Sequence, residues 1–476
     1  MQKLATRDRL LQKYLAGFKE ELQVRLIGPE IECIAVDRET LKPPTARQTV
    51  QFLENIARMR NGWQKNYGYL FIDGRWMVCC TSVSKKIGGY NACISTDVGT
   101  GQIEASVTPS PTLRKAEERL RETLSTVCDV AEKSGMYVLG LGIQPYASPE
   151  PKLVMPKGRY LTFLEIFGEH LGINSMNAAA QCHVEVTRGE APTVSNALNG
   201  FSPALQALTA NSAIVEGKMT EHVEFGRRGW DSLVKSGKID ARRVGIAERF
   251  DSVPVYFDRM LQFSPILTAR RGEEFRFADP GLKEPMAKYL GQYVEVHNLK
   301  DGSATKIRIT PTDMAFLEGT LWWEARLKSV FGTVELRCCP FQPNIDMIMA
   351  INSVALGLAA NSTEAEEYLG AFTQKQLSEA RLNVQKNGLD SKLGNTPITD
   401  VAAKMLEIAR KGLIAIGEET SYLAPLEHNL SNKINPATRS IEVYLSLVRS
   451  SEEDISEEGM RKFIELHRFD PKLVAA

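Results

Sequence analysis

The chain has 476 residues, 43% of them hydrophobic and 24% charged, so it can bury a large core and does not have the composition of a disordered protein. Its 58 basic and 58 acidic side chains balance, which argues against a dedicated nucleic-acid or membrane-surface binder, because both need surplus Lys and Arg. The 8 cysteines show no C-x-x-C spacing and residues 1–15 are charged throughout, so we expect neither a zinc knuckle nor a signal peptide, and a reducing cytoplasm as the compartment.

The first part of the chain is predicted to consist mostly of strands. Hydrophobic periodicity indicates a helix over 10–22, a strand over 23–37 and a helix over 47–59. Two further strands are predicted on either side of Asp73-Gly74. They are expected to form a hairpin, because a tight hairpin turn needs residues that tolerate positive φ, as Asp-Gly does. Further strands are predicted over 102–108, 136–141, 181–187 and 332–338, and further helices over 112–133 and from Ser202-Pro203 to about residue 218.

From about residue 344 onward the pattern is mostly helical. Helices are predicted over 345–360, 363–384, 398–415, 436–448 and 453–467. Polar Asn and Ser residues interrupt the uncharged stretch 347–363, which therefore predicts a buried helix and not a membrane span. Strands first and helices late favour an α+β fold: a mostly antiparallel, curved sheet backed by helices, with a helical C-terminal region.

Four of the predicted strands carry acidic and polar side chains on one face. Residues i and i+2 of a strand point the same way, and the next residue points the other way. The shared faces hold Glu30 and Glu32; Gln102, Glu104 and Ser106; Gln181, His183 and Glu185; and Thr333, Glu335 and Arg337. The alternate positions, such as Ile31 and Cys33, are apolar.

Two interpretations of these polar faces differ in function. The solvated face of an antiparallel sheet alternates in the same way, but it usually contains Lys, and these four faces contain none. Gathered carboxylates repel one another unless cations bind between them, and Glu, Asp and His suit Mg²⁺ or Mn²⁺. If the strands are neighbours, we expect a multi-metal site of the kind that holds nucleotide phosphates. Asp97 could reach it from a loop, although a turn cap explains this residue equally well.

Three arginine pairs form a second group of candidates. Arg227-Arg228, Arg242-Arg243 and Arg270-Arg271 could bind an anionic substrate, although such pairs are more often surface charge. The sequence contains no P-loop, so any ATP must be held in another way.

Five segments, taken in order, resemble the motifs of the glutamate–cysteine ligase superfamily, in particular its carboxylate–amine ligase branch. They are Gly28-Pro29-Glu30-Ile31-Glu32; Gly101-Gln102-Ile103-Glu104-Ala105-Ser106 with Pro109; Cys182-His183-Val184-Glu185-Val186; Thr209-Ala210-Asn211-Ser212 with Gly217-Lys218; and Trp323-Glu324-Ala325-Arg326 with Phe331-Gly332-Thr333-Val334-Glu335-Leu336-Arg337. The match runs from Arg25 to Pro343. Cys338-Cys339 stands where relatives often carry an acidic or polar pair, and residues 231–309 contain no motif that aligns.

The resemblance implies a fold and a chemistry. Residues 1–343 would form a catalytic body related to the sheet of glutamine synthetase, and residues 344–476 a helical region packed on it. ATP would phosphorylate the γ-carboxylate of glutamate, and an amine would then displace the phosphate. The residues implied as metal ligands are Glu30, Glu32, Asp97, Glu104, His183 and Glu335. Arg337 and Arg326 would neutralise the transferring phosphoryl group, and Glu30, Glu32 and Arg337 would contact the nucleotide. Glu185 shares the face without a firm role.

We therefore expect a cytoplasmic enzyme of glutathione biosynthesis that uses ATP and Mg²⁺, or Mn²⁺, to join glutamate to cysteine. One alternative keeps this chemistry with another amine as acceptor. A second alternative is a catalytically silent relative that binds glutamate or nucleotide, although the intact acidic and arginine residues argue against it. The expected partners are small-molecule substrates, with neither a nucleic acid nor a membrane among them.

Overall fold

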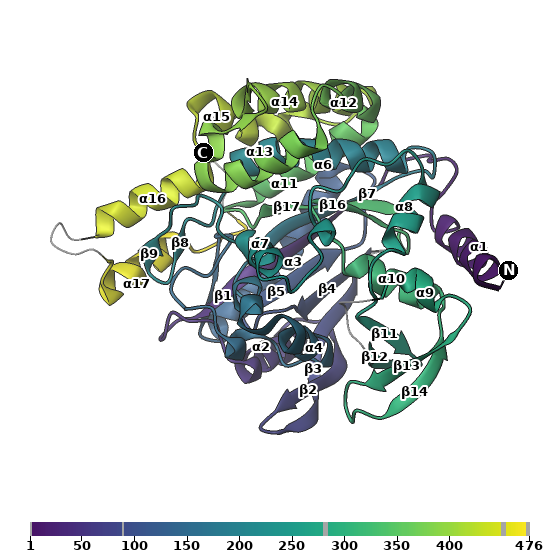
Figure 1. Ribbon diagram of the computed structural model, residues 1–476. Helices are drawn as coiled ribbons and strands as arrows, with labels where there is room; N and C mark the ends of the chain where they lie inside the picture. Colours follow the sequence, from purple (N-terminus) through teal and green to yellow (C-terminus); the bar gives the residue numbers. More distant parts are fainter. Residues whose placement is uncertain (1, 88–89, 279–283, 449–453, 473–476) are drawn as a thin grey trace.

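The computed structural model describes residues 2–87, 90–278, 284–448 and 454–472, and a nine-stranded antiparallel sheet forms its centre (Figure 1). In spatial order the strands are β16 (Ala325–Lys328), β17 (Thr333–Pro340), β7 (Ala179–Glu185), β1 (Ile27–Asp37), β5 (Gln102–Val107), β4 (Tyr90–Thr96), β3 (Arg75–Ile87) and β2 (Gln64–Ile72), and β6 (Met136–Leu139) pairs with the last residues of β1. The predicted α+β class, an antiparallel sheet backed by helices, is confirmed.

Helices cover the apolar face of this sheet in two layers. The first layer contains α2 (Ala46–Met59), α3 (Leu113–Lys133), α6 (Ala191–Thr209) and α11 (Ile345–Ala360). The second, at the top of Figure 1, contains α12 (Ser362–Leu369), α13 (Gln374–Asn387), α14 (Ile398–Ala415) and α15 (Ala424–Asn432). The last two helices, α16 (Pro436–Leu447) and α17 (Glu457–Leu466), lie at the left of that view and contact each other. Ile31 and Cys33 of β1 are fully buried beneath the two layers, so the apolar parity of the strand faces the helices.

Shorter elements stand around the opposite, polar face. They are α4 (Gly158–Phe167), α5 (Leu171–Asn174), α7 (Arg228–Lys235), α10 (Pro311–Gly319), and β10 (Val244–Gly245) paired with β15 (Trp322–Trp323). A separate four-stranded antiparallel sheet contains β11 (Leu267–Arg270), β12 (Glu273–Phe277), β13 (Tyr293–Asn298) and β14 (Ala304–Arg308). The remaining elements are α1 (Gln2–Leu15), α8 (Val253–Met260), α9 (Met286–Tyr289), β8 (Ile214–Val215), β9 (Lys218–Met219), β18 (Lys392–Leu393) and β19 (Thr396–Pro397).

Several predicted elements are confirmed with their turn chemistry. The helices expected over 345–360 and 398–415 are α11 and α14. The hairpin between β2 and β3 turns at Asp73 and Gly74, whose φ angles are 52° and 75°. Both central positions are therefore left-handed, as an Asp-Gly hairpin requires.

The prediction that a helix begins at Ser202-Pro203 is wrong. The helix α6 begins at Ala191, with Pro192 in its first turn, and Pro203 lies in its interior. A proline cannot donate to the carbonyl four residues earlier, here that of Asn199. The hydroxyl of Ser202 donates to that carbonyl at 2.7 Å instead, which replaces the missing bond. Residues 210–218 are not helical, and β8 and β9 occupy part of this segment.

Other boundaries also differ from the predictions. The first helix spans residues 2–15 and not 10–22, and the following strand begins at Ile27. The single helix expected over 363–384 is two helices, because a capping box between Thr373 and Gln376 begins α13 afresh. The start expected for the last helix, Glu453, lies outside the described residues. The strand β4 and the four-stranded sheet were not predicted.

No single helix in the four described ranges is long and apolar enough to span a membrane. The helices α11 and α12 meet the length and composition criteria only together, and they are bent by 89°. The helix α11 is buried along nearly its whole length, as predicted for the uncharged stretch.

The crossing of α11 and α14 depends on glycine. A Cβ atom added at Gly412 would overlap the carbonyl oxygen of Gly357. We expect Gly412→Ala to lower the free energy of unfolding by about 1–3 kcal/mol, because the two backbones must separate. Thermal unfolding measures the effect. The control is Gly189→Ala, since a Cβ there has no neighbour within 4 Å, and equal melting temperatures for the two variants would contradict the prediction.

Candidate active site

The register of the central sheet places the predicted acidic faces side by side. The strand β1 lies between β5 and β7, and β7 also pairs with β17. Glu32 is directly opposite Glu104, and Glu335 is directly opposite His183. Glu30, two residues from Glu32, shares its face. Carboxylates from three strands and the imidazole from a fourth therefore meet on the face that the helices leave open.

Glu30, His183 and Glu335 form the tighter of two groups. One ligand atom from each lies within 4.8 Å of the others. The His183 Nε2 atom lies 3.0 Å from Glu30 Oε2, and its Nδ1 atom lies 3.0 Å from the Thr333 hydroxyl. Burial raises the pKa of Glu30, but the hydrogen bond and charge of His183 outweigh burial and lower it. The donor set, two carboxylates and an imidazole, suits a divalent cation.

Glu32, Glu104 and Asp97 form the second group. Burial, followed by the charge of Asp97, raises the pKa of Glu32 to about 8. Burial, followed by the charge of Glu30, raises the pKa of Glu104 well above its usual range. Asp97 accepts a hydrogen bond of 2.6 Å from the Tyr160 hydroxyl. This group holds more negative charge than its neighbours neutralise, and a bound cation would relieve the excess.

Two arginines surround Glu335. Burial raises the pKa of Glu335, but Arg326 and Arg337 outweigh burial and hold it well below its usual range. Arg326 donates to the Glu335 carboxylate at 2.7 and 3.2 Å and, through its remaining nitrogen, to the carbonyls of residues 318, 319 and 321. Arg337 donates to Glu335 and, at 2.7 Å, to the Gln181 side chain. Both arginines line the same cavity, and Arg326 donates to the protein through all three of its guanidinium nitrogens.

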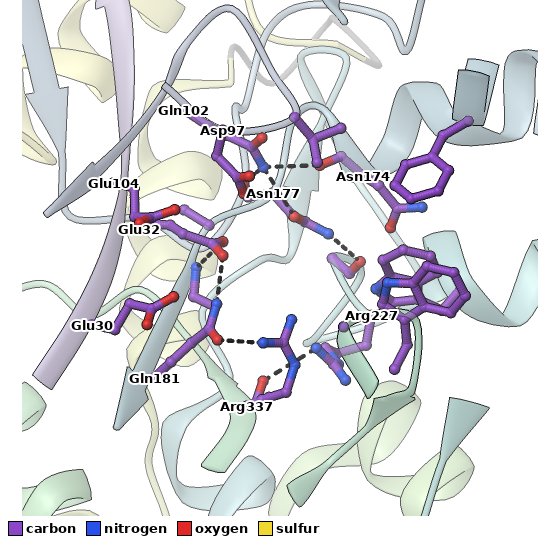
Figure 2. A pocket seen from close by; sticks show the side chains of 18 of the residues that line it. Glu30, Glu32, Asp97, Gln102, Glu104, Asn174, Asn177, Gln181, Arg227 and Arg337 are labelled. Carbon is purple, nitrogen blue, oxygen red and sulfur yellow. Dashed lines mark hydrogen bonds between the residues drawn. The ribbon is translucent and has the colours of Figure 1, made fainter. Parts of the chain in front are cut away.

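Two cavities adjoin these groups and share Glu30. The first, of about 400 Å³, is shown in Figure 2, and the ten labelled residues there are among those that line it. The second, of about 560 Å³, is lined by His183 together with apolar groups such as Pro29, Val107 and Phe331. The rings of Phe331 and His183 are nearly perpendicular to each other, with centroids 5.7 Å apart. Of the acidic residues in the two groups, Glu30 lines both the polar cavity and the more apolar one, whereas Glu32, Asp97 and Glu104 line the first cavity alone.

Glu185 lies apart from both acidic groups. Its carboxylate pairs with the Lys19 amino group at 2.5 Å and accepts a hydrogen bond of 3.3 Å from the Leu26 backbone. It lines only the second cavity. The structure thus leaves Glu185 outside both groups and brings together the other predicted residues: Glu30, Glu32, Asp97, Glu104, His183, Glu335, Arg326 and Arg337.

Sequence reasoning missed several residues of the first cavity. Tyr160 and Arg159 come from the start of α4, and the stacked rings of Trp230 and Trp322, 4.4 Å between centroids, form another wall. Lys157, which precedes α4 and does not line this cavity, donates from its amino group to the Thr96 carbonyl at 2.6 Å, and burial, followed by the charge of Arg159, lowers its pKa to about 8. These residues follow no recurring spacing, so a motif search could not have found them.

Of the three arginine pairs, one reaches the first cavity. Arg227 lines it, donates to the Arg337 carbonyl at 3.2 Å and forms an ion pair of 2.8 Å with Glu324. The pairs at 242–243 and 270–271 line neither of the two cavities. Of the six arginines in these pairs, only Arg227 therefore lines either of the two cavities, and its binding of an anionic substrate stays a prediction.

Comparison with known proteins identifies the family. A family model described as glutamate–cysteine ligase family 2 matches residues 26–473. Chloroplastic glutamate–cysteine ligases of Brassica juncea and Arabidopsis thaliana are each 25% identical over 460 residues, which cover 92% of this chain and 81% and 80% of theirs. A solved Francisella tularensis glutamate–cysteine ligase in complex with AMP aligns with 10% identity and a TM-score of 0.47 over 94% of this chain and 89% of that chain. The chain belongs to glutamate–cysteine ligase family 2.

Proposed function

We propose that the protein is an ATP-dependent ligase that joins the γ-carboxylate of glutamate to the amine of cysteine through a γ-glutamyl phosphate. The observation that carries this proposal is the acidic cluster beside two cavities that share Glu30. A phosphoryl group can pass there from a nucleotide on one side to a carboxylate on the other. Membership of the family and the activity named for the plant relatives support the same reaction.

We propose that Glu30, His183 and Glu335, together with Glu32, Asp97 and Glu104, hold divalent cations. Their convergence, and the raised pKa of Glu32 and Glu104, fit positive ions better than they fit an empty acidic face. Oxygen-rich ligands favour Mg²⁺. When bound, such ions neutralise and orient the phosphate oxygens.

The second cavity suits the nucleotide and the first suits glutamate. Val107, Pro109 and Phe331 offer apolar surface to a purine base, and Arg227 and Arg337 offer positive charge to carboxylates. We propose that Arg337, which donates to Gln181 and Glu335, contacts the transferring phosphoryl group, and that Arg326 holds Glu335 in place beside it.

The chemistry follows from these positions in two steps. A γ-carboxylate oxygen of glutamate bonds to the terminal phosphorus of ATP as the bond from that phosphorus to the bridging oxygen breaks, and ADP leaves. The amine nitrogen of the acceptor then bonds to the carbonyl carbon of this γ-glutamyl phosphate, the bond from that carbon to the phosphate oxygen breaks, phosphate leaves and the amine loses a proton. Arg337 balances the charge that builds on the phosphoryl oxygens in the first step.

An assay of ADP release with ATP, Mg²⁺, glutamate and a panel of amines tests the proposal. Turnover with cysteine is the expected result. Turnover only with another amine would keep the chemistry and change the acceptor. If no amine supports turnover while glutamate or ATP still raises the melting temperature, the protein is a silent binding relative and the proposal fails.

The assignment of the two cavities makes a separate prediction. We expect Phe331→Ala to raise the KM for ATP about tenfold and to leave the KM for glutamate unchanged, because the lost ring contact belongs to the nucleotide side. Arg227→Lys should raise the KM for glutamate and leave the KM for ATP unchanged, since a single ammonium cannot replace the guanidinium fork. Steady-state kinetics with each substrate varied in turn measure both. Equal changes in both KM values for either variant would contradict the assignment.

A further inference from the structure

An asparagine in the first cavity has a side-chain amide that no part of the described chain satisfies. Asn174 ends α5, is 3% exposed and lines the cavity, yet neither its amide nitrogen nor its amide oxygen has a hydrogen-bond partner among the described residues. Buried polar groups are nearly always paired, so an unpaired donor and acceptor on one side chain call for an explanation.

The surrounding structure holds this amide in place. The Asn174 backbone carbonyl accepts a hydrogen bond of 2.8 Å from the Gln102 side chain. Gly229 of α7 lies against the amide so closely that a Cβ atom there would overlap it. The packing therefore fixes the position of the amide and keeps room for it without giving it a partner, as expected of a group that waits for a ligand.

The position of Asn174 indicates which part of a ligand it meets. Figure 2 shows Asn174 and Arg227 on one side of the cavity, with Glu30, Glu32 and Glu104 on the other. The γ-carboxylate that reacts must lie at the acidic side, so the opposite end of the same amino acid lies toward Asn174. That end carries an ammonium, which donates, and a carboxylate, which accepts. An amide offers both complementary groups.

We propose that Asn174 binds the α-amino and α-carboxylate end of the amino acid that is phosphorylated, and so makes the enzyme specific for an α-amino acid over a simple dicarboxylate. The proposal rests on the function proposed above. The side-chain oxygen of Asn174 accepts from the α-ammonium and its nitrogen donates to the α-carboxylate, beside the charge of Arg227. Asn174 is thus a specificity residue that takes no part in phosphoryl transfer.

The test compares glutamate with two analogues in the ADP-release assay. Glutarate lacks the α-amino group, and 4-aminobutyrate lacks the α-carboxylate. For Asn174→Ala we expect kcat/KM for glutamate to fall about 10- to 100-fold through KM, as for the loss of hydrogen bonds to charged groups. The much slower reactions of the two analogues should change less, so that discrimination shrinks. The KM values for ATP and cysteine should stay the same.

A second variant separates binding from a structural role. Asn174→Leu replaces the amide by an apolar group of similar size, so without substrate its melting temperature should equal or exceed that of the wild type, while stabilisation by glutamate is lost. A residue needed only for folding would give a lower melting temperature. Gly229→Ala, which displaces the amide without changing it, should also raise the KM for glutamate.

The outcomes are distinct. If Asn174→Ala lowers kcat/KM equally for glutamate and for both analogues, or changes only the KM for cysteine, the proposed role of Asn174 is overturned and the proposed function stands. If the wild type releases no ADP with glutamate and any amine, the proposed function fails, and this inference fails with it.

Discussion

Glu104→Gln is expected to lower the rate of ATP turnover at least about 10²–10³-fold, while leaving the protein as stable as the wild type. Glu104 faces Glu32 across the β1–β5 pair, and burial together with neighbouring carboxylates opposes its charge. A neutral glutamine of the same shape removes a proposed metal ligand and also removes repulsion. The melting temperature in metal-free buffer should therefore be unchanged or higher. ADP release and thermal unfolding measure the two effects.

Glu335→Gln provides the matched comparison. It should abolish turnover to the same extent but lower the melting temperature, because Arg326 would keep a buried charge without its partner. The exposed Glu295 of β13 is the control, and Glu295→Gln should leave both quantities near wild type. Near-normal turnover in either Glu104→Gln or Glu335→Gln would show that these carboxylates do not hold the proposed cations.

Glu324→Gln is expected to lower the free energy of unfolding by about 3–5 kcal/mol. Glu324 is fully buried and pairs with Arg227 at 2.8 Å and with Arg381 of α13. Arg381 has a second partner, Asp231 at 2.8 Å, but Arg227 depends on Glu324 for its ion pair. When Glu324 loses its negative charge, the positive charges of the buried Arg227 and Arg381 are no longer balanced. Urea unfolding followed by circular dichroism measures the loss.

An ion pair at the surface of the same helical region is the control. Glu364 is about one-third exposed and pairs with Lys404 and Lys411, so Glu364→Gln should cost less than about 1 kcal/mol. Glu324→Gln should also raise the KM for glutamate, because Arg227 is no longer fixed on the cavity wall. A loss of stability no larger than that of the surface control would show that the buried cluster does not hold α13 to the sheet.

The strand faces were predictable because their physics is local. Alternation along a strand alone decides that Glu30 and Glu32 point opposite to Ile31, whatever the partner strands are. The hairpin at Asp73-Gly74 was predictable for the same reason, since its backbone needs only residues that tolerate positive φ. The prediction from local sequence failed at Pro203, which was expected near the start of a helix but lies inside one. The Ser202 hydroxyl donates there to the carbonyl that the proline cannot reach, so the helix continues.

The sequence by itself determined which side chains share a face and, through five ordered segments, the kind of chemistry that such faces serve. Only the tertiary structure decided that β1, β5, β7 and β17 are neighbours, and so placed Glu32 opposite Glu104 and Glu335 opposite His183. It also decided which side chains complete the cavity, such as Asn174, which lies on a short helix without a motif. The reason is that periodicity acts between adjacent residues, whereas strand order and cavity walls depend on contacts between residues far apart in the chain.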